Sequence, residues 1–121
     1  MRRFVKPEHQ LVVEVFVRDL GRSVNFYSRL GFELKRREDH FAELIWEDHL
    51  FFLDERSDAP TPGDFPLANV RIMVPNVDHY WNLANELKAR IVLPIADRYY
   101  GLRDFIMTDP DGFGLRFATP M

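Results

Sequence analysis

Arg116 is the residue of this sequence whose setting most suggests binding chemistry. It follows the turn sequence Asp109-Pro110-Asp111-Gly112, which favours a tight turn leading into a strand. In the alternating pattern that follows, one face would carry Phe113, Leu115 and Phe117, and the other Gly112, Gly114, Arg116 and Ala118. Small neighbours leave space around a side chain with five hydrogen-bond donors. The pattern predicts that Arg116 lines a ligand cavity; alternatively, an edge strand directs Arg116 into water.

Two further charged residues lie in apolar, β-branched stretches. Glu14 lies within residues 11–18, and Arg71, with Asn69 beside it, lies within residues 67–74. We expect all three side chains on the same concave face as Arg116. Glu14, Arg71 and Arg116 could satisfy one another as a buried ion pair or triad. If Glu14 pairs with Arg71, Arg116 is left as a spare cation that could bind a carboxylate or phosphate through two hydrogen bonds.

Hydrophobic periodicity and turn signals predict the elements that would position these residues. Module one covers residues 11–54 and module two covers residues 67–118, with a proline-containing connector at 55–66. The expected strands of module one are 11–18, 32–37, 41–46 and 50–54, with a helix from Leu20 to Leu30 capped by Asp19 and ended by Gly31. Those of module two are 67–74, 91–95, 102–107 and 113–118, with a helix that follows an Asn76 cap.

The two halves repeat the same order of elements. Residues 17–20 superpose on residues 74–77, which sets Glu14 at the same position as Arg71. A repeat of strand, helix and three strands indicates two related structural units within one domain.

Two motifs resemble those of a known family. The stretch VRDLGRSVNFYSRLGF at 17–32 looks like the first-module signature of the vicinal oxygen chelate superfamily, and DPDGFGLRF at 109–117 resembles its closing signature. That superfamily includes glyoxalase I, bleomycin-resistance proteins and extradiol dioxygenases. The resemblance implies an α+β fold in which two tandem βαβββ modules form a curved mixed sheet around a cavity. It also implies a homodimer.

The resemblance does not extend to the metal ligands of the family. In the metal-using members, four side chains from the first and last strands of each module bind a divalent ion. The matching positions here are Val12, Asn69, Arg116 and either Phe52 or Leu53. Apolar side chains and a guanidinium do not bind such ions, and Asn69 offers one carbonyl at most. The expectation is therefore a member without metal or other cofactor, of the bleomycin-resistance type.

Aromatic residues are the remaining candidates for ligand contact. Tyr99 and Tyr100, followed by Gly101, would form a loop that closes over a cavity rim, or a surface loop with one tyrosine tucked in. Trp46 and Phe52 would line the cavity of module one, or fill it as core.

Composition excludes several classes of function. The 121 residues carry a formal charge of −3 with a pI near 5.8, which argues against nucleic acid as a partner. Cysteine is absent, so thiol catalysis and cysteine-based metal sites are excluded. No apolar run is long enough to span a membrane, and we expect a cytoplasmic protein that does not bind membranes.

These observations favour a protein that binds a small organic, anion-bearing ligand. Sequestration of an antibiotic is one version, although two cavity arginines would disfavour cationic drugs such as bleomycin. An alternative is a lyase, isomerase or dioxygenase of the same superfamily, with Glu14 as general base or with an atypical metal site. A structural dimer whose own side chains fill its cavity is a third interpretation.

Overall fold

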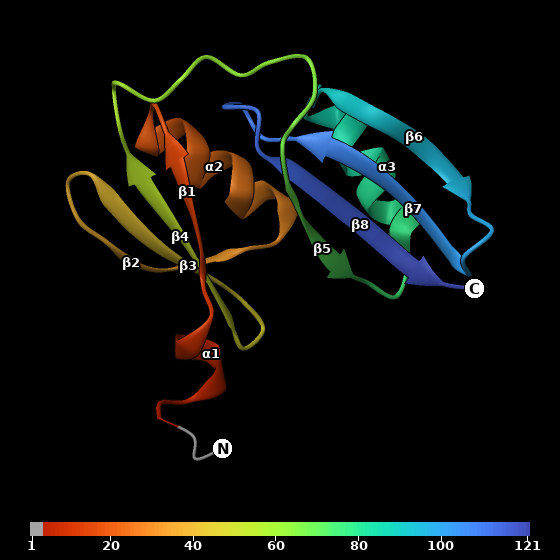
Figure 1. Ribbon diagram of the computed structural model, residues 1–121, viewed down its shortest axis with the longest axis horizontal. Helices are drawn as coiled ribbons and strands as arrows, with labels where there is room; N and C mark the ends of the chain where they lie inside the picture. Colours follow the sequence, from red (N-terminus) through yellow and green to blue (C-terminus); the bar gives the residue numbers. More distant parts are fainter. Residues whose placement is uncertain (1–3) are drawn as a thin grey trace. The chain divides into compact units, whose positions relative to one another are not determined.

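The computed structural model describes residues 4–121 and divides the chain into two compact units (Figure 1). Unit one ends at Pro60, and unit two runs from Thr61 to Met121. Each unit is an α+β module with its own four-stranded sheet and its own long helix.

Unit one begins with a short helix and then forms strand, helix and three strands. Its elements are α1 (Pro7–Gln10), β1 (Val13–Val17), α2 (Leu20–Leu30), β2 (Glu33–Arg37), β3 (Phe41–Trp46) and β4 (His49–Glu55). The order in the sheet is β1-β4-β3-β2, with β1 parallel to β4 and the other pairs antiparallel.

Unit two repeats that topology. Its elements are β5 (Asn69–Met73), α3 (Val77–Glu86), β6 (Ile91–Asp97), β7 (Leu102–Thr108) and β8 (Gly114–Pro120). The sheet order is β5-β8-β7-β6, and β5 runs parallel to β8. The two long helices begin at Leu20 and Val77, which lie 57 positions apart in the chain. The predicted tandem βαβββ fold is confirmed.

Local differences from the sequence prediction are small. An additional short helix, α1, precedes the first strand, because Pro7 at its first position presets a helical φ; residues 1–3 lie outside the described residues. The last strand of unit one extends to Glu55, and the last strand of unit two extends to Pro120. The prediction placed Glu55 in the connector, whereas the structure places it in the sheet.

The boundaries of α2 follow from its capping residues. The Asp19 side chain accepts a hydrogen bond from the Arg22 amide at 3.0 Å, as expected of an N-cap. At the other end, Gly31 has a φ of +124°, a conformation open to glycine and costly for other residues.

The first backbone N–H of each long helix is bound by the end of the last strand in its unit. Leu20 N donates to the Glu55 carboxylate, and Val77 N donates to the Thr119 hydroxyl, both at 2.8 Å. Asn76 occupies the N-cap position of α3, as predicted, but its side chain makes no capping hydrogen bond, and the first helix N–H, that of Val77, binds the Thr119 hydroxyl. The two units thus use equivalent strand positions, with different chemistry, to bind the helix start.

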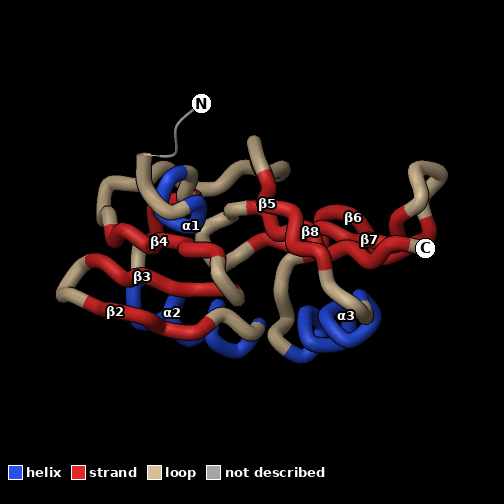
Figure 2. Tube along the Cα trace, turned by 90° about the horizontal axis from the view of Figure 1, so that it is seen from below, coloured by secondary structure: helices blue, strands red, loops and turns tan. Residues whose placement is uncertain are grey.

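Each long helix packs against one face of its sheet, and the opposite face, called the open face below, carries no long helix (Figure 2). In unit one, fully buried Tyr27 of α2 contacts the Phe32 and Phe51 rings. In unit two, fully buried Phe117 of β8 stacks on Tyr80 of α3 at 4.7 Å. The apolar core of each unit therefore lies between helix and sheet, and the other sheet face is available for polar side chains.

The helices are short. Among residues 4–121, none is both long and apolar enough to cross a membrane.

Candidate functional site

The open face of the unit-two sheet brings two predicted arginines together. Ile72 and Phe117 point toward α3, so Arg71 and Arg116, their neighbours in β5 and β8, point to the opposite face. Arg71 and Arg116 are direct register partners in this parallel pair. The side chains of Arg71 and Arg116 therefore project from adjacent positions on one face of the unit-two sheet.

Asp104 lies at the centre of the polar network on this face. It belongs to β7, and its side chain is fully buried although it points away from α3. Arg98 Nε donates to Oδ1 at 2.8 Å, and the Tyr100 hydroxyl donates to Oδ2 at 2.7 Å. Arg116 donates to the same Oδ2 from Nε at 3.0 Å and from Nη2 at 2.8 Å. Four donors therefore surround one carboxylate.

The network keeps its groups in their usual ionisation states. Burial alone would raise the pKa of Asp104, but hydrogen bonds from Arg98, Tyr100 and Arg116 outweigh it and lower that pKa. The pKa of Tyr100 is raised by desolvation and by its bond to Asp104. Near neutral pH the cluster therefore contains a carboxylate, a neutral phenol and two guanidinium cations.

Arg116 is not the spare cation that the sequence predicted. Its guanidinium is ion-paired with Asp104, and its side chain is only 18% exposed. The prediction missed Asp104. Strand alternation places Asp104 and its neighbour Phe105 on opposite faces of β7, with Asp104 on the same face as Arg116. That alternation was the available signal in the sequence.

Arg71 is the cation of this face with no such pairing. It is exposed, and within residues 61–121 no side chain forms a hydrogen bond or ion pair with it. Asn69, two positions before it, is also exposed and opposes Gly114. The predicted ion pair of Arg71 with Glu14 stays a prediction.

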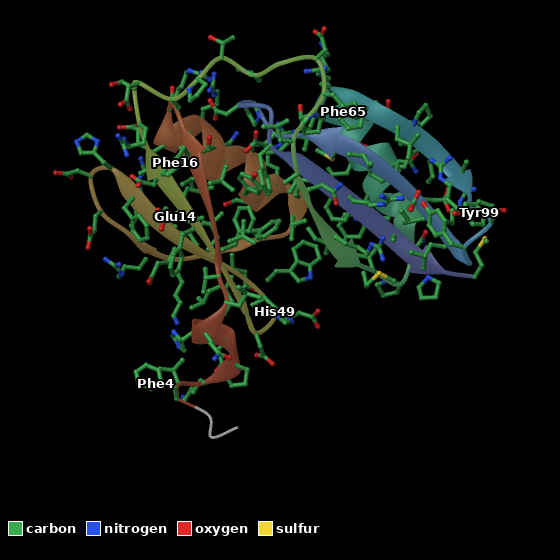
Figure 3. All side chains as sticks on the ribbon, viewed as in Figure 1. Phe4, Glu14, Phe16, His49, Phe65 and Tyr99 are labelled. Carbon is green, nitrogen blue, oxygen red and sulfur yellow. The ribbon has the colours of Figure 1, made fainter. Side chains whose placement is uncertain are left out.

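The two tyrosines of the β6–β7 loop have different surroundings. Tyr100 is held by Asp104, and Arg116 lies 5.7 Å from the centre of its ring. Tyr99 is fully exposed at the end of the loop and meets Tyr100 edge-on at 5.2 Å (Figure 3). Tyr100 is itself 42% exposed, and the two interpretations of this loop, a cavity rim or a surface loop, stay predictions.

The open face of the unit-one sheet carries acidic and aromatic side chains. Glu14 opposes Phe52 in the register of β1 and β4, and Phe52 packs edge-on against Phe41 at 5.3 Å. Glu14 is exposed, and no side chain among residues 4–60 forms an ion pair with it. Half-exposed Phe16 lies two positions along β1 (Figure 3).

Trp46 lies away from that open face. Its ring packs against Phe32 at 5.0 Å and closely approaches Gly31 at the end of α2. Register places Trp46 and Phe52 on opposite faces of the sheet. Of the two aromatic candidates in unit one, Phe52 faces the open side and Trp46 packs with the core.

The residues at the expected metal positions do not fit a divalent ion. Val12 and Phe52 offer no donor atom, and Arg116 is itself a cation bound to Asp104. Within the described range 4–121, no group of three or more His, Asp or Glu side chains is arranged to bind a metal. These positions therefore provide no donor set for a divalent metal.

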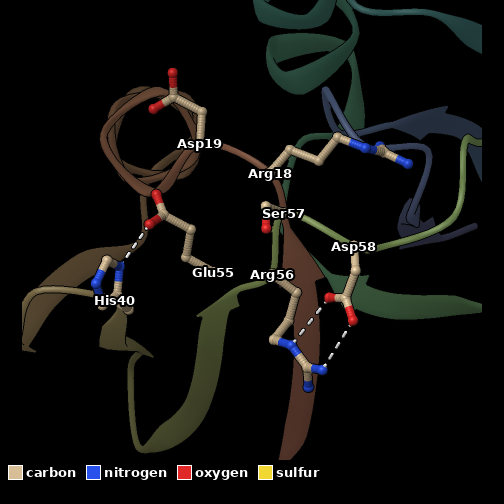
Figure 4. A pocket seen from close by; sticks show the side chains of 7 residues that line it. All are labelled: Arg18, Asp19, His40, Glu55, Arg56, Ser57 and Asp58. Atoms are coloured by element: carbon tan, nitrogen blue, oxygen red, sulfur yellow. Dashed lines mark hydrogen bonds and ion pairs between the residues drawn. The ribbon is translucent and has the colours of Figure 1, made fainter.

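A polar pocket of about 870 Å³ in unit one was not foreseen from the sequence (Figure 4). It is lined by Arg18, Asp19, His40, Glu55, Arg56, Ser57 and Asp58. His40 Nδ1 lies 2.7 Å from Glu55 Oε1, while the other Glu55 oxygen accepts from Leu20 N. This arrangement ties the β2–β3 turn, the end of β4 and the start of α2 together.

The His40–Glu55 contact predicts a pH-dependent contribution to stability. The Glu55 carboxylate raises the pKa of His40 above its usual 6.5, so this contribution is full below 6.5 and is lost as pH rises through the raised value. The pKa of Glu55 is lowered below 4.5, first by Leu20 N and then by His40, so its contribution is lost as pH falls through that lowered value. The difference in melting temperature between the wild type and His40→Gln should be largest between these limits.

Thermal melts from pH 3 to 9, a range spanning both titrations, would measure that difference. His49→Gln, which removes an exposed histidine at the start of β4, provides the matched control. An equal pH profile for the two variants would contradict the assignment.

Comparisons with known proteins agree with this architecture. The model of the Glyoxalase/Bleomycin resistance protein/Dioxygenase superfamily matches residues 9–117. No curated protein matches this chain.

Solved structures share the fold at low sequence identity. TioX from Micromonospora sp. ML1 is 24% identical, with a TM-score of 0.76 over 92% of this chain and 98% of that one. A glyoxalase/bleomycin resistance protein/dioxygenase family enzyme from Burkholderia phytofirmans PsJN is 18% identical, with a TM-score of 0.80 over 91% and 97% of the two chains. A bleomycin resistance determinant encoded on transposon Tn5 is 18% identical, with a TM-score of 0.73 over 92% and 97%. The chain described here belongs to the Glyoxalase/Bleomycin resistance protein/Dioxygenase superfamily.

Proposed function

We propose that this protein binds a small organic anion, without a metal, on the open face of the unit-two sheet. The observation that carries the proposal is Arg71, an exposed cation without an ion pair inside its unit, beside Arg116 in the sheet register. Arginine binds carboxylate, sulfonate and phosphate groups through charge-assisted, often paired, hydrogen bonds.

Charge balance supports an anionic ligand. Three guanidinium groups, those of Arg71, Arg98 and Arg116, belong to this face, and Asp104 is the carboxylate that neutralises part of their charge. Within this cluster two positive charges remain uncompensated. An anion is attracted to such a surface, and a cationic drug is repelled.

Met73 on the same face supports an organic ligand. Its side chain, in β5, is almost half exposed, whereas Ala118 and Ile106 on the same side of β8 and β7 are buried. A ligand with a ring or a short hydrocarbon part could cover Met73 while its anionic group binds Arg71. Asn69 adds an amide that can donate to an oxygen and accept from a hydroxyl.

Two fluorescent probes that differ in charge provide the test. We expect anilinonaphthalene sulfonate to bind at least tenfold more tightly than the neutral N-phenylnaphthylamine, which has the same aromatic rings. Arg71→Gln should weaken sulfonate binding about tenfold, because a hydrogen bond to a charged group contributes roughly 1.5–3 kcal/mol. Binding of the neutral probe should change less than about twofold. Fluorescence titration measures both affinities.

Arg29→Gln is the matched control, because it removes an exposed arginine from the last turn of α2 in unit one. It should leave the affinity for the sulfonate unchanged. Equal affinity of the wild type for the two probes, or equal losses in the two variants, would rule out the proposed function.

A further inference from the structure

Asp104 is a buried charge with unusually complete hydrogen bonding. Its carboxylate has no exposed surface and accepts four hydrogen bonds from three residues. Burying a carboxylate costs a large desolvation free energy unless the group is paired, so the hydrogen bonds at Asp104 have a large cost to offset. The residues that cover it are Arg98 and Tyr100 from the β6–β7 connection and Arg116 from β8.

The contacts with Asp104 determine how Arg116 is presented. Arg116 binds the carboxylate through Nε and Nη2, so one edge of the planar guanidinium is occupied. Nη2 also donates to the Tyr100 hydroxyl, and the Tyr100 ring lies beside the guanidinium. No hydrogen bond within unit two occupies Nη1, which leaves its two protons for an incoming acceptor.

Asp104 also reduces repulsion between the cations. Arg98 and Arg116 donate to the same carboxylate, and Arg71 starts from the register position next to Arg116. Without the negative charge, three cations would share a small area, and Arg116 would be free to turn away from Arg71.

We propose that Asp104 is the positioning residue of this ligand site: by fixing one edge of Arg116, it directs the Nη1 side of the guanidinium toward an anion bound at Arg71. This inference rests on the proposed function. In this role Asp104 does not itself touch the ligand. Tyr100 holds Arg116 in place from the other side.

Replacement of the charge at nearly constant shape is the direct test. Asp104→Asn adds net positive charge to the face but releases Arg116 from its fixed orientation; if orientation decides binding, the variant should bind anilinonaphthalene sulfonate at least tenfold more weakly and N-phenylnaphthylamine within about twofold of the wild type. Arg103→Gln is the matched control: it removes an ion-paired arginine from the same strand, β7, but from the face that carries α3, where Arg103 binds Asp78 and Asp97, so it should change sulfonate affinity less than about threefold. Equal losses in Asp104→Asn and Arg103→Gln would show a general structural effect and overturn the positioning role.

Tyr100 provides a readout that does not depend on a ligand. Its pKa is raised by desolvation and by Asp104, and lowered by Arg116 and Arg98. Asp104→Asn removes the contribution of the carboxylate and leaves those of the cations, so Tyr100 should ionise at lower pH. Ultraviolet difference titration, with Tyr100→Phe to identify the signal, measures this midpoint. An unchanged midpoint in Asp104→Asn would contradict the assigned contacts.

A second variant keeps the test decisive if Asp104→Asn does not fold. Arg116→Lys preserves the charge but removes the planar group that Asp104 holds at one edge. It should weaken sulfonate binding about tenfold, and unchanged affinity would show that the orientation of the guanidinium is irrelevant. Failure of the proposed function is recognised separately, because the wild type would then bind both probes equally.

Discussion

Replacement of Gly114 by alanine is expected to lower the free energy of unfolding by about 3 kcal/mol. A Cβ atom at this position would lie 2.6 Å from the Ala68 carbonyl oxygen and 2.8 Å from the Asn69 Cβ. Gly114 and Asn69 are register partners of the parallel β5–β8 pair, so the clash could be relieved only by separating these strands. Urea denaturation of the wild type and the variant measures the change.

The same substitution should also weaken binding at the proposed site, because Arg71 and Arg116 are aligned by this strand pair. Gly63→Ala is the matched control, since a Cβ atom there would meet nothing within 4 Å. That control should change stability by less than about 0.5 kcal/mol. Equal stability of Gly114→Ala and the wild type would show that the close approach of β5 and β8 is not required.

Truncation of Phe117 to alanine should be the most destabilising change in unit two, at about 4 kcal/mol. Phe117 is fully buried, stacks on Tyr80 at 4.7 Å and lies 5.8 Å from Phe105. Its removal leaves a cavity between α3 and the centre of the sheet, and the surrounding rings cannot fill it completely. Urea denaturation, with near-ultraviolet circular dichroism as the probe, measures this loss.

Phe65→Ala provides the comparison for this truncation, because the Phe65 side chain lies mainly in solvent. It removes the same number of atoms, and we expect it to change stability by less than about 0.5 kcal/mol. A cost below about 1 kcal/mol for Phe117→Ala would contradict the assignment of this ring to the core.

Local chemistry in the sequence was sufficient to predict the order of the long helices and strands, whereas their arrangement in two βαβββ modules was implied by the family resemblance. Asp19 and Gly31 delimit α2 because one accepts an amide proton and the other adopts a positive φ, and both properties belong to the residue itself. The alternation of large and small side chains along residues 113–118 likewise separates the face that packs on α3 from the open face. The repeat at an offset of 57 positions carried these assignments from one unit to the other.

The hydrogen-bond partners at the helix starts depend on contacts between segments that are far apart in the chain. Asn76 precedes α3 as predicted, but the side chain that binds the first helix N–H belongs to Thr119, because β8 ends beside the helix start and the Thr119 hydroxyl reaches Val77 N. In the same way, Glu55 reaches both His40 and Leu20 only because β4 ends between their segments.

The candidate site shows the same contrast between what the local sequence pattern predicts and what long-range contacts decide. The sequence by itself determined that Arg71 and Arg116 share one face of a sheet, because side chains alternate along a strand with period two. Only the tertiary structure decided the partner of Arg116: Asp104 lies twelve positions earlier in the chain, and the loop containing Tyr100 folds over it. Alternation specifies the face on which a side chain lies, whereas strand register and loop path specify the groups it meets there.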